Sequence, residues 1–204
     1  MSNNKKTYLI YKPYMMLSQF TQEVANQVTL KDLDYTFEKD IYPVGRLDAD
    51  SEGLLVLSND KTLTDKLLNP KNKHWRTYYV QVEGAITQEA IAALCKGVEI
   101  KANKNQPPYL TQPAKVEFLQ AEDIAFLPER NPPVRFRANI PTSWLSISLI
   151  EGKNRQVRKM TAAVGFPTLR LVRVAIGAWQ LKNNAINPNS AKLCTTEEIA
   201  LFFK

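Results

Sequence analysis

Residues 45–60 read GRLDADSEGLLVLSND and join a charged loop to an apolar run and a helix start. The apolar run covers residues 53–57 without interruption, which is typical of a strand buried on both faces. Asn59 or Asp60 is a suitable N-cap, and it predicts a helix over residues 61–68. This stretch therefore predicts a buried strand followed at once by a helix.

The charged loop lies between Gly45 and Gly53 and holds one arginine and three carboxylates. A loop fixed to a buried strand is a common place for reactive groups, because the strand holds them rigidly. An acidic surface turn that balances basic charge elsewhere explains the same residues. The composition of the loop leaves both interpretations open.

Outward from this stretch, strands alternate only irregularly with helices. Further strands are expected at residues 7–11, 76–82, 114–119, 144–149 and 169–176. Further helices are expected at residues 87–95 and 154–164, with Thr87 and Asn154 as N-caps. The excess of strands predicts an α+β fold with a mixed, largely antiparallel central sheet and flanking helices. Residues 1–204 are expected to form one domain, in which the segment 97–125 has no assigned role.

A second charged motif, EGKNRQVRKM, occupies residues 151–160. Val157, Met160 and Val164 have the spacing of the buried stripe of a helix. Arg155 and Arg158 are three residues apart near the expected helix start, where the helix dipole already favours an anion. The motif predicts an anion site, although an exposed basic helix face would have the same composition.

The net charge of +7 is concentrated in one part of the chain. Between Glu129 and Arg173 nine basic residues face two acids, so this stretch carries 9 − 2 = +7, and the remainder balances at 18 against 18. Seven of the nine are arginines, whose planar side chains suit phosphate groups. The distribution indicates a polyanionic partner, with a solvated basic face as the alternative.

Several classes of function are excluded by composition. The single histidine, His74, argues against a histidine-based metal site and against a Ser-His-Asp triad. Cys95 and Cys194 lie 99 residues apart and are expected to be reduced thiols in a cytoplasmic protein. No run approaches the roughly 20 apolar residues of a membrane span. Any chemistry therefore falls to carboxylates, arginines, tyrosines or the backbone.

A third motif, RTYYV at residues 76–80, places tyrosines on a strand. Tyrosines there usually pack in the core, but an aromatic ring is also a platform for a nucleic-acid base. In order along the chain, the three motifs resemble those of pseudouridine synthases of the RsuA branch. Lys12-Pro13 matches a further family element, and the family usually has arginine where Lys153 and Lys159 stand.

The resemblance implies roles for single residues. Asp48 would be the catalytic aspartate, Arg158 would form an ion pair with it, and Tyr78 would stack on the target base. Arg46 would face the RNA. The other expected RNA contacts are Lys12, Lys153, Arg155 and Lys159. The implied fold is a central sheet in two α+β halves with a catalytic cleft between them.

The resemblance also implies the reaction, the isomerisation of a uridine in large-subunit ribosomal RNA to pseudouridine. The chain is most similar to the E-type large-subunit subgroup, and no S4-type RNA-binding domain is expected before residue 12. No cofactor or metal is expected, since nothing is oxidised or reduced. Ribosomal RNA, free or in an assembly intermediate, is the expected partner of a cytoplasmic monomer. The alternatives are an inactive RNA-binding module of the same fold, a nucleic-acid glycosylase and a basic assembly scaffold.

Overall fold

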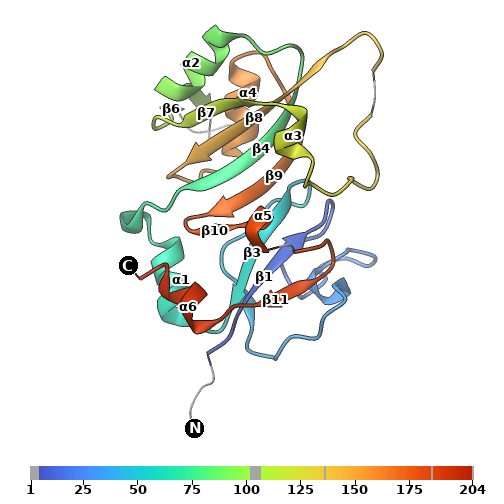
Figure 1. Cartoon of the computed structure of the whole chain (residues 1–204), viewed down its shortest axis with the longest axis vertical. Helices are drawn as coiled ribbons and strands as arrows, with labels where there is room; N and C mark the ends of the chain where they lie inside the picture. Colours follow the sequence, from blue (N-terminus) through green and yellow to red (C-terminus); the bar gives the residue numbers. More distant parts are fainter. Residues whose placement is uncertain (1–4, 102–106, 136, 185, 204) are drawn as a thin grey trace. The chain divides into compact units, whose positions relative to one another are not determined.

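The computed structural model describes residues 5–101, 107–135, 137–184 and 186–203. The chain divides into two compact units, which Figure 1 shows by their colour along the sequence. The first unit comprises the chain up to His74 and from Arg173 onward, and the second comprises Trp75–Val172. Each unit contains both strands and helices, in agreement with the predicted α+β class. That both units act as one domain stays a prediction.

The sheet of the first unit is built around β3 (Glu52–Ser58), every residue of which is buried. β3 pairs antiparallel with β1 (Thr7–Lys12), and β1 pairs antiparallel with β11 (Ala191–Leu193). Smaller elements complete this unit: η1 (Leu30–Asp32), β2 (Tyr42–Pro43), η2 (Pro70–Asn72), β10 (Trp179–Gln180), α5 (Leu181–Asn184) and α6 (Thr196–Ala200). The strand predicted from the apolar run is therefore confirmed as a central, fully buried one.

The core of the first unit lies on the face of β1 and β3 that carries Tyr8, Ile10, Leu55 and Leu57. The loop that follows β1 contributes Met16 and further apolar residues to the same cluster. Alternate residues of a strand point to one face, which explains the spacing of two in both strands. Burial of these side chains is the main term that stabilises the unit.

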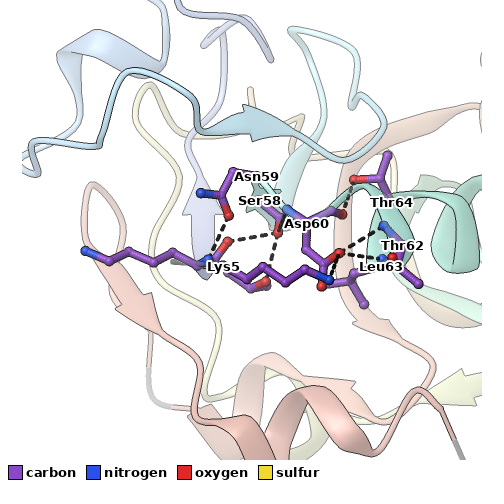
Figure 2. Close-up of polar contacts among 9 residues, drawn as sticks. Lys5, Ser58, Asn59, Asp60, Thr62, Leu63 and Thr64 are labelled. Atoms are coloured by element: carbon purple, nitrogen blue, oxygen red, sulfur yellow. Dashed lines mark hydrogen bonds and ion pairs between the residues drawn. The ribbon is translucent and has the colours of Figure 1, made fainter. Parts of the chain in front are cut away.

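The predicted helix is confirmed as α1 (Lys61–Leu68). Its N-cap is Asp60, whose Oδ1 accepts hydrogen bonds from the N–H groups of Thr62 and Leu63 at 2.9 and 3.4 Å. Figure 2 shows these contacts together with Lys5, whose Nζ lies 3.0 Å from the same oxygen. Ser58 Oγ accepts from the N–H of Asp60, so the end of β3 is tied to the helix start.

The second unit contains an antiparallel sheet in which β8 (Thr142–Leu149) lies between β4 (Arg76–Glu83) and β7 (Lys115–Leu119). Ser143, Leu145, Ile147 and Leu149 are buried, and the residues between them are less so. This alternation is typical of a half-buried strand, and the strand predicted at residues 144–149 is confirmed. A separate antiparallel pair, β5 (Glu99–Lys101) and β6 (Pro108–Leu110), was not predicted.

Three helices accompany these strands: α2 (Gln88–Lys96), α3 (Ala121–Ile124) and α4 (Gln156–Ala163). Thr87 caps α2 as predicted, with Oγ1 accepting from the N–H of Ala90 at 3.3 Å. The predicted cap of α4 is wrong. The helix begins at Gln156, and its N-cap is Arg155 in a left-handed conformation with φ of 52° rather than Asn154.

The chain passes from the second unit to the first within β9 (Thr168–Ile176). Its last residue, Ile176, pairs with Trp179 of β10. The strand predicted at residues 169–176 is thereby confirmed. None of the helices in the described residues is long and apolar enough to span a membrane.

Candidate active site

The loop between β2 and β3 places Asp48 between two anchored neighbours; residues 45–52 are called the acidic loop below. Ser18 Oγ donates to the carbonyl of Leu47 at 2.9 Å and accepts from its N–H at 3.0 Å. On the other side, the carbonyl of Ala49 accepts from the N–H of Met15 at 2.7 Å. Asp48 itself is half-buried. The backbone at Asp48 is therefore fixed, while its side chain remains partly accessible.

The start of the acidic loop depends on a glycine. Gly45 has φ of +77°, a left-handed conformation that side-chain-bearing residues rarely adopt. A Cβ at this position would lie 3.1 Å from Cδ2 of Leu68 at the end of α1. Just before the turn, the N–H of Val44 donates to the carbonyl of Val56 at 2.8 Å. The loop thus leaves the sheet at a defined point.

Lys12, an expected RNA contact, is buried below the acidic loop. Its Nζ donates to the carbonyls of Met16, Pro13 and Ala49 at 2.7, 2.9 and 3.2 Å. Burial lowers the pKa of Lys12 to about 7, against the opposing effect of nearby carboxylates. The expected RNA contact of Lys12 is corrected here, because a fully buried ammonium that already donates to three carbonyls cannot reach RNA.

The three acids of the loop differ in their surroundings. Glu52 is buried, and its Oε1 accepts from the hydroxyl of Tyr11 at 2.9 Å. Asp48 and Asp50 are half-buried. Buried Arg173 donates from Nε to the carbonyl of Leu54 at 2.8 Å. Glu52 and Arg173 therefore belong to the interior of the unit, which leaves Asp48 and Asp50 as the loop's accessible carboxylates.

Arg46 is the exposed residue of the acidic loop. One of its guanidinium nitrogens donates to Oε1 of Gln19 at 3.0 Å. This contact joins the acidic loop to the long connection that follows β1. The exposed position is compatible with the expected contact to RNA.

The second unit carries the other expected residues. Tyr78 lies on β4 opposite Ile147 and packs against the core cluster that contains Val157 and Met160 of α4. Arg158, also on α4, is half-buried, and a guanidinium nitrogen lies 3.4 Å from the carbonyl oxygen of Thr168. The tyrosine thus has both a packing role and a partly accessible ring.

The loop before α4 is basic and exposed; residues 152–155 are called the basic loop below. Lys153, Asn154 and Arg155 are all exposed, and Lys159 is half-buried in the first turns of α4. Because Arg155 precedes the helix in a left-handed conformation, the predicted helical i, i+3 relation between Arg155 and Arg158 does not hold. Arg155 lies in a left-handed conformation before the helix, whereas Arg158 lies within α4.

The structure thus groups the expected residues into two sets. Arg46 and Asp48 lie on the acidic loop of the first unit, and Lys12 lies beneath them. Tyr78, Arg158 and the basic loop belong to the second unit. Sequence reasoning missed Ser18 and Met15 as supports of the acidic loop, because a serine and a methionine in a loop carry no recognisable signal for such a role. Within the described residues, no three His, Cys, Asp or Glu side chains are grouped so as to hold a metal.

A partly accessible carboxylate on an anchored loop and an exposed basic loop are features expected of an enzyme that acts on a nucleic acid. The chain belongs to the RNA pseudouridylate synthase family, whose model matches residues 6–163. It is 53% identical to ribosomal large subunit pseudouridine synthase E of Vibrio parahaemolyticus over 85% of this chain and 68% of that protein. The synthase E of Xanthomonas axonopodis pv. citri is 49% identical over 85% of this chain and 86% of that protein.

A solved structure described as a pseudouridylate synthase shows the same fold. Its TM-score is 0.76, with 98% of this chain and 74% of that chain covered. At 22% identity this likeness concerns the fold alone. The predicted pseudouridine synthase fold and the predicted family are both confirmed.

Proposed function

We propose that this chain isomerises a specific uridine of large-subunit ribosomal RNA to pseudouridine, with Asp48 as the catalytic carboxylate. The supporting observation is the identity of 53% to a synthase named for that subunit, across most of both chains. Asp48 lies within the matched family region, on a loop whose backbone is fixed on both sides of it. A rigid, partly accessible carboxylate suits a group that must meet one atom of a bound nucleotide.

The reaction detaches uracil from ribose at N1, turns it and rejoins it through C5. A carboxylate can serve as nucleophile or base in such a sequence, as it does in glycoside hydrolysis. No electrons are exchanged with a second reactant, so the isomerisation is balanced without a cofactor. The target base must leave the helical stack, at a cost of a few kcal/mol.

Tyr78 and Arg158 are proposed to act at the same nucleotide. Stacking of the base on the Tyr78 ring would return roughly 1–3 kcal/mol of the unstacking energy. Arg158 is proposed to pair with the Asp48 carboxylate and to orient it, as the family resemblance implies. Arg46, Lys153, Arg155 and Lys159 are proposed to contact the RNA.

The experiment measures tritium release from ribosomal RNA labelled at uridine C5, because bond formation at C5 expels that hydrogen. We expect release by the wild type and none by Asp48→Asn, which keeps the shape of the side chain but not its charge. Asp50→Asn is the matched control, since Asp50 is a half-buried carboxylate of the same loop. It should retain most of the activity. Substantial turnover by Asp48→Asn would refute the assignment.

The remaining expectations concern the cellular context. We propose that the protein acts as a cytoplasmic monomer, on protein-free RNA or on an assembly intermediate. The tritium assay with both substrates identifies the one that is turned over. Light scattering of the purified chain, with and without RNA, determines the oligomeric state. A stable dimer would contradict this part of the proposal.

A further inference from the structure

The basic loop is held at its start by Glu151, whose carboxylate gathers three hydrogen bonds. Oε2 accepts from the hydroxyl of Tyr109. Oε1 accepts from the N–H of Gln112 at 2.8 Å and from Nε2 of Gln156 at 2.5 Å. Tyr109 lies on β6 and Gln112 follows that strand, so a distant part of the second unit reaches the loop.

Gln156 closes the loop from its other end. Its side chain is buried, and its Oε1 accepts from the N–H of Lys153 at 2.9 Å. The N–H of Gln156 in turn donates to the carbonyl of Lys153 at 3.1 Å. Glu151 and Gln156 therefore tie the two ends of the basic loop to each other.

Lys153 contacts a member of this network, and Arg155 has an unusual backbone conformation next to it. Nζ of Lys153 lies 5.1 Å from the centroid of the Tyr109 ring, within the range of a cation–π interaction. Arg155 has φ of 52°, a left-handed conformation that is unfavourable for a residue with a side chain and persists where the surroundings impose it. The backbone that carries both side chains is thus bounded by the hydrogen bonds of Glu151 and Gln156.

We propose that Tyr109 and Glu151 are positioning residues that hold the basic loop in its RNA-binding conformation. This assigns a role to β6, which lies in the part of the chain that no sequence motif explained. The inference rests on the proposed function, in which Lys153 and Arg155 contact the RNA backbone.

An explanation by charge alone predicts the opposite change in RNA affinity when the Glu151 carboxylate is removed. A carboxylate beside the basic loop repels RNA phosphates, so its removal would strengthen RNA binding if only charge mattered. Under the positioning role, the loss of the carboxylate weakens binding, because a glutamine at this position offers one acceptor oxygen and an NH2 group where Glu151 offers two acceptor oxygens to three donors. The sign of the effect separates the two explanations.

The first experiment compares Glu151→Gln with Glu117→Gln in RNA affinity and in tritium-release kinetics. Both changes add one unit of positive charge to the second unit, but Glu117 is an exposed residue of β7 outside the network. We expect Glu117→Gln to bind RNA as tightly as the wild type or slightly more tightly. Glu151→Gln should raise KM and the dissociation constant about 5- to 10-fold with little change in kcat. Equal or tighter binding by Glu151→Gln would overturn the proposal.

The second experiment uses Tyr109→Phe, which keeps the ring beneath Lys153 and removes only the hydroxyl. We expect a KM increase of about 3-fold.

In the background of Arg155→Ala, Glu151→Gln should add little further loss of RNA affinity, because both changes act through the same loop. Fully additive losses would contradict the positioning role. RNA affinity is measured independently of turnover. If the wild type binds RNA but releases no tritium, the proposed function is refuted. The effect of Glu151→Gln on RNA affinity still tests the positioning role.

Discussion

Lys12, the last residue of β1, links the end of that strand to the acidic loop. An ammonium has three N–H donors, and the carbonyls of Pro13, Met16 and Ala49 use all three. Ala49 directly follows Asp48, so the contact fixes the backbone next to the proposed catalytic carboxylate. The family resemblance indicates Lys12 as an RNA contact, and nothing local to it in the sequence shows which carbonyls converge on it.

Burial of Lys12 predicts a pH dependence of stability. Its pKa is lowered from 10.5 to about 7, so between these values the unfolded chain binds more protons than the folded chain. The free energy of unfolding contributed by Lys12 therefore rises with pH across this window and is lower at pH 7 and below. Between pH 7 and 8.5, the stability difference between wild type and Lys12→Met should grow by about 1.5 kcal/mol in favour of the wild type.

Urea unfolding of both proteins at several pH values measures this difference. The window ends below pH 9, because burial raises the pKa of Cys194 to about 12 and this thiol titrates in the opposite sense above its usual value of 9.0. Parallel stability curves from pH 7 to 8.5 would show that Lys12 keeps an ordinary pKa.

Among the elements, β3, α1 and β8 could be predicted because their signals are local. An unbroken apolar run, an N-cap residue and a strict alternation each lie within a few residues. β2, β5, β6, β10 and β11 have only two or three residues each, and their partners determine them. The sequence places the start of α4 too early because Arg155 has a left-handed conformation, which no local pattern of the sequence indicates.

The junction of β3 and α1 offers a test at the same scale. Burial raises the pKa of Asp60, but the Lys5 ion pair and the N–H groups of Thr62 and Leu63 outweigh it, so the net pKa is lowered. Asp60→Ala removes the cap and should lower the free energy of unfolding by about 1 kcal/mol. Lys5→Ala keeps the cap and should cost less than about 0.5 kcal/mol, because the Lys5 side chain is 60% exposed.

Chemical denaturation near pH 7 compares these two variants with the wild type. The ionised form of Asp60 is the stronger cap, because a charged acceptor makes stronger hydrogen bonds and pairs with Lys5. The difference for Asp60→Ala should therefore shrink as the pH falls below its usual pKa of 3.8 and through the lowered value in the folded chain. A loss for Lys5→Ala as large as that for Asp60→Ala would show that the ion pair, rather than the cap, stabilises the junction.

At the scale of the whole molecule, the count of basic residues between positions 129 and 173 exceeds the number that RNA can contact. Of the nine basic residues between positions 129 and 173, Arg170 and Arg173 are buried and bonded to carbonyls, which leaves 9 − 2 = 7. Arg137 forms a partly exposed ion pair with Glu83 at 2.9 Å. The sequence locates the basic stretch but does not separate the arginines that bond to interior carbonyls from those exposed to solvent.

The slope of log K against log salt measures how many phosphate groups the protein neutralises when it binds RNA. Removing one basic side chain that pairs with a phosphate should reduce the slope of log K against log salt by about 0.7–0.9. Lys153→Ala combined with Arg155→Ala should therefore lower the slope by about 1.5. The matched control combines Lys39→Ala with Lys61→Ala, two exposed lysines of the first unit outside the basic stretch, and should leave the slope unchanged. Filter binding between about 50 and 200 mM salt measures both slopes. Equal reductions in the two double variants would mean that RNA responds to total charge and that the basic loop has no special part in binding.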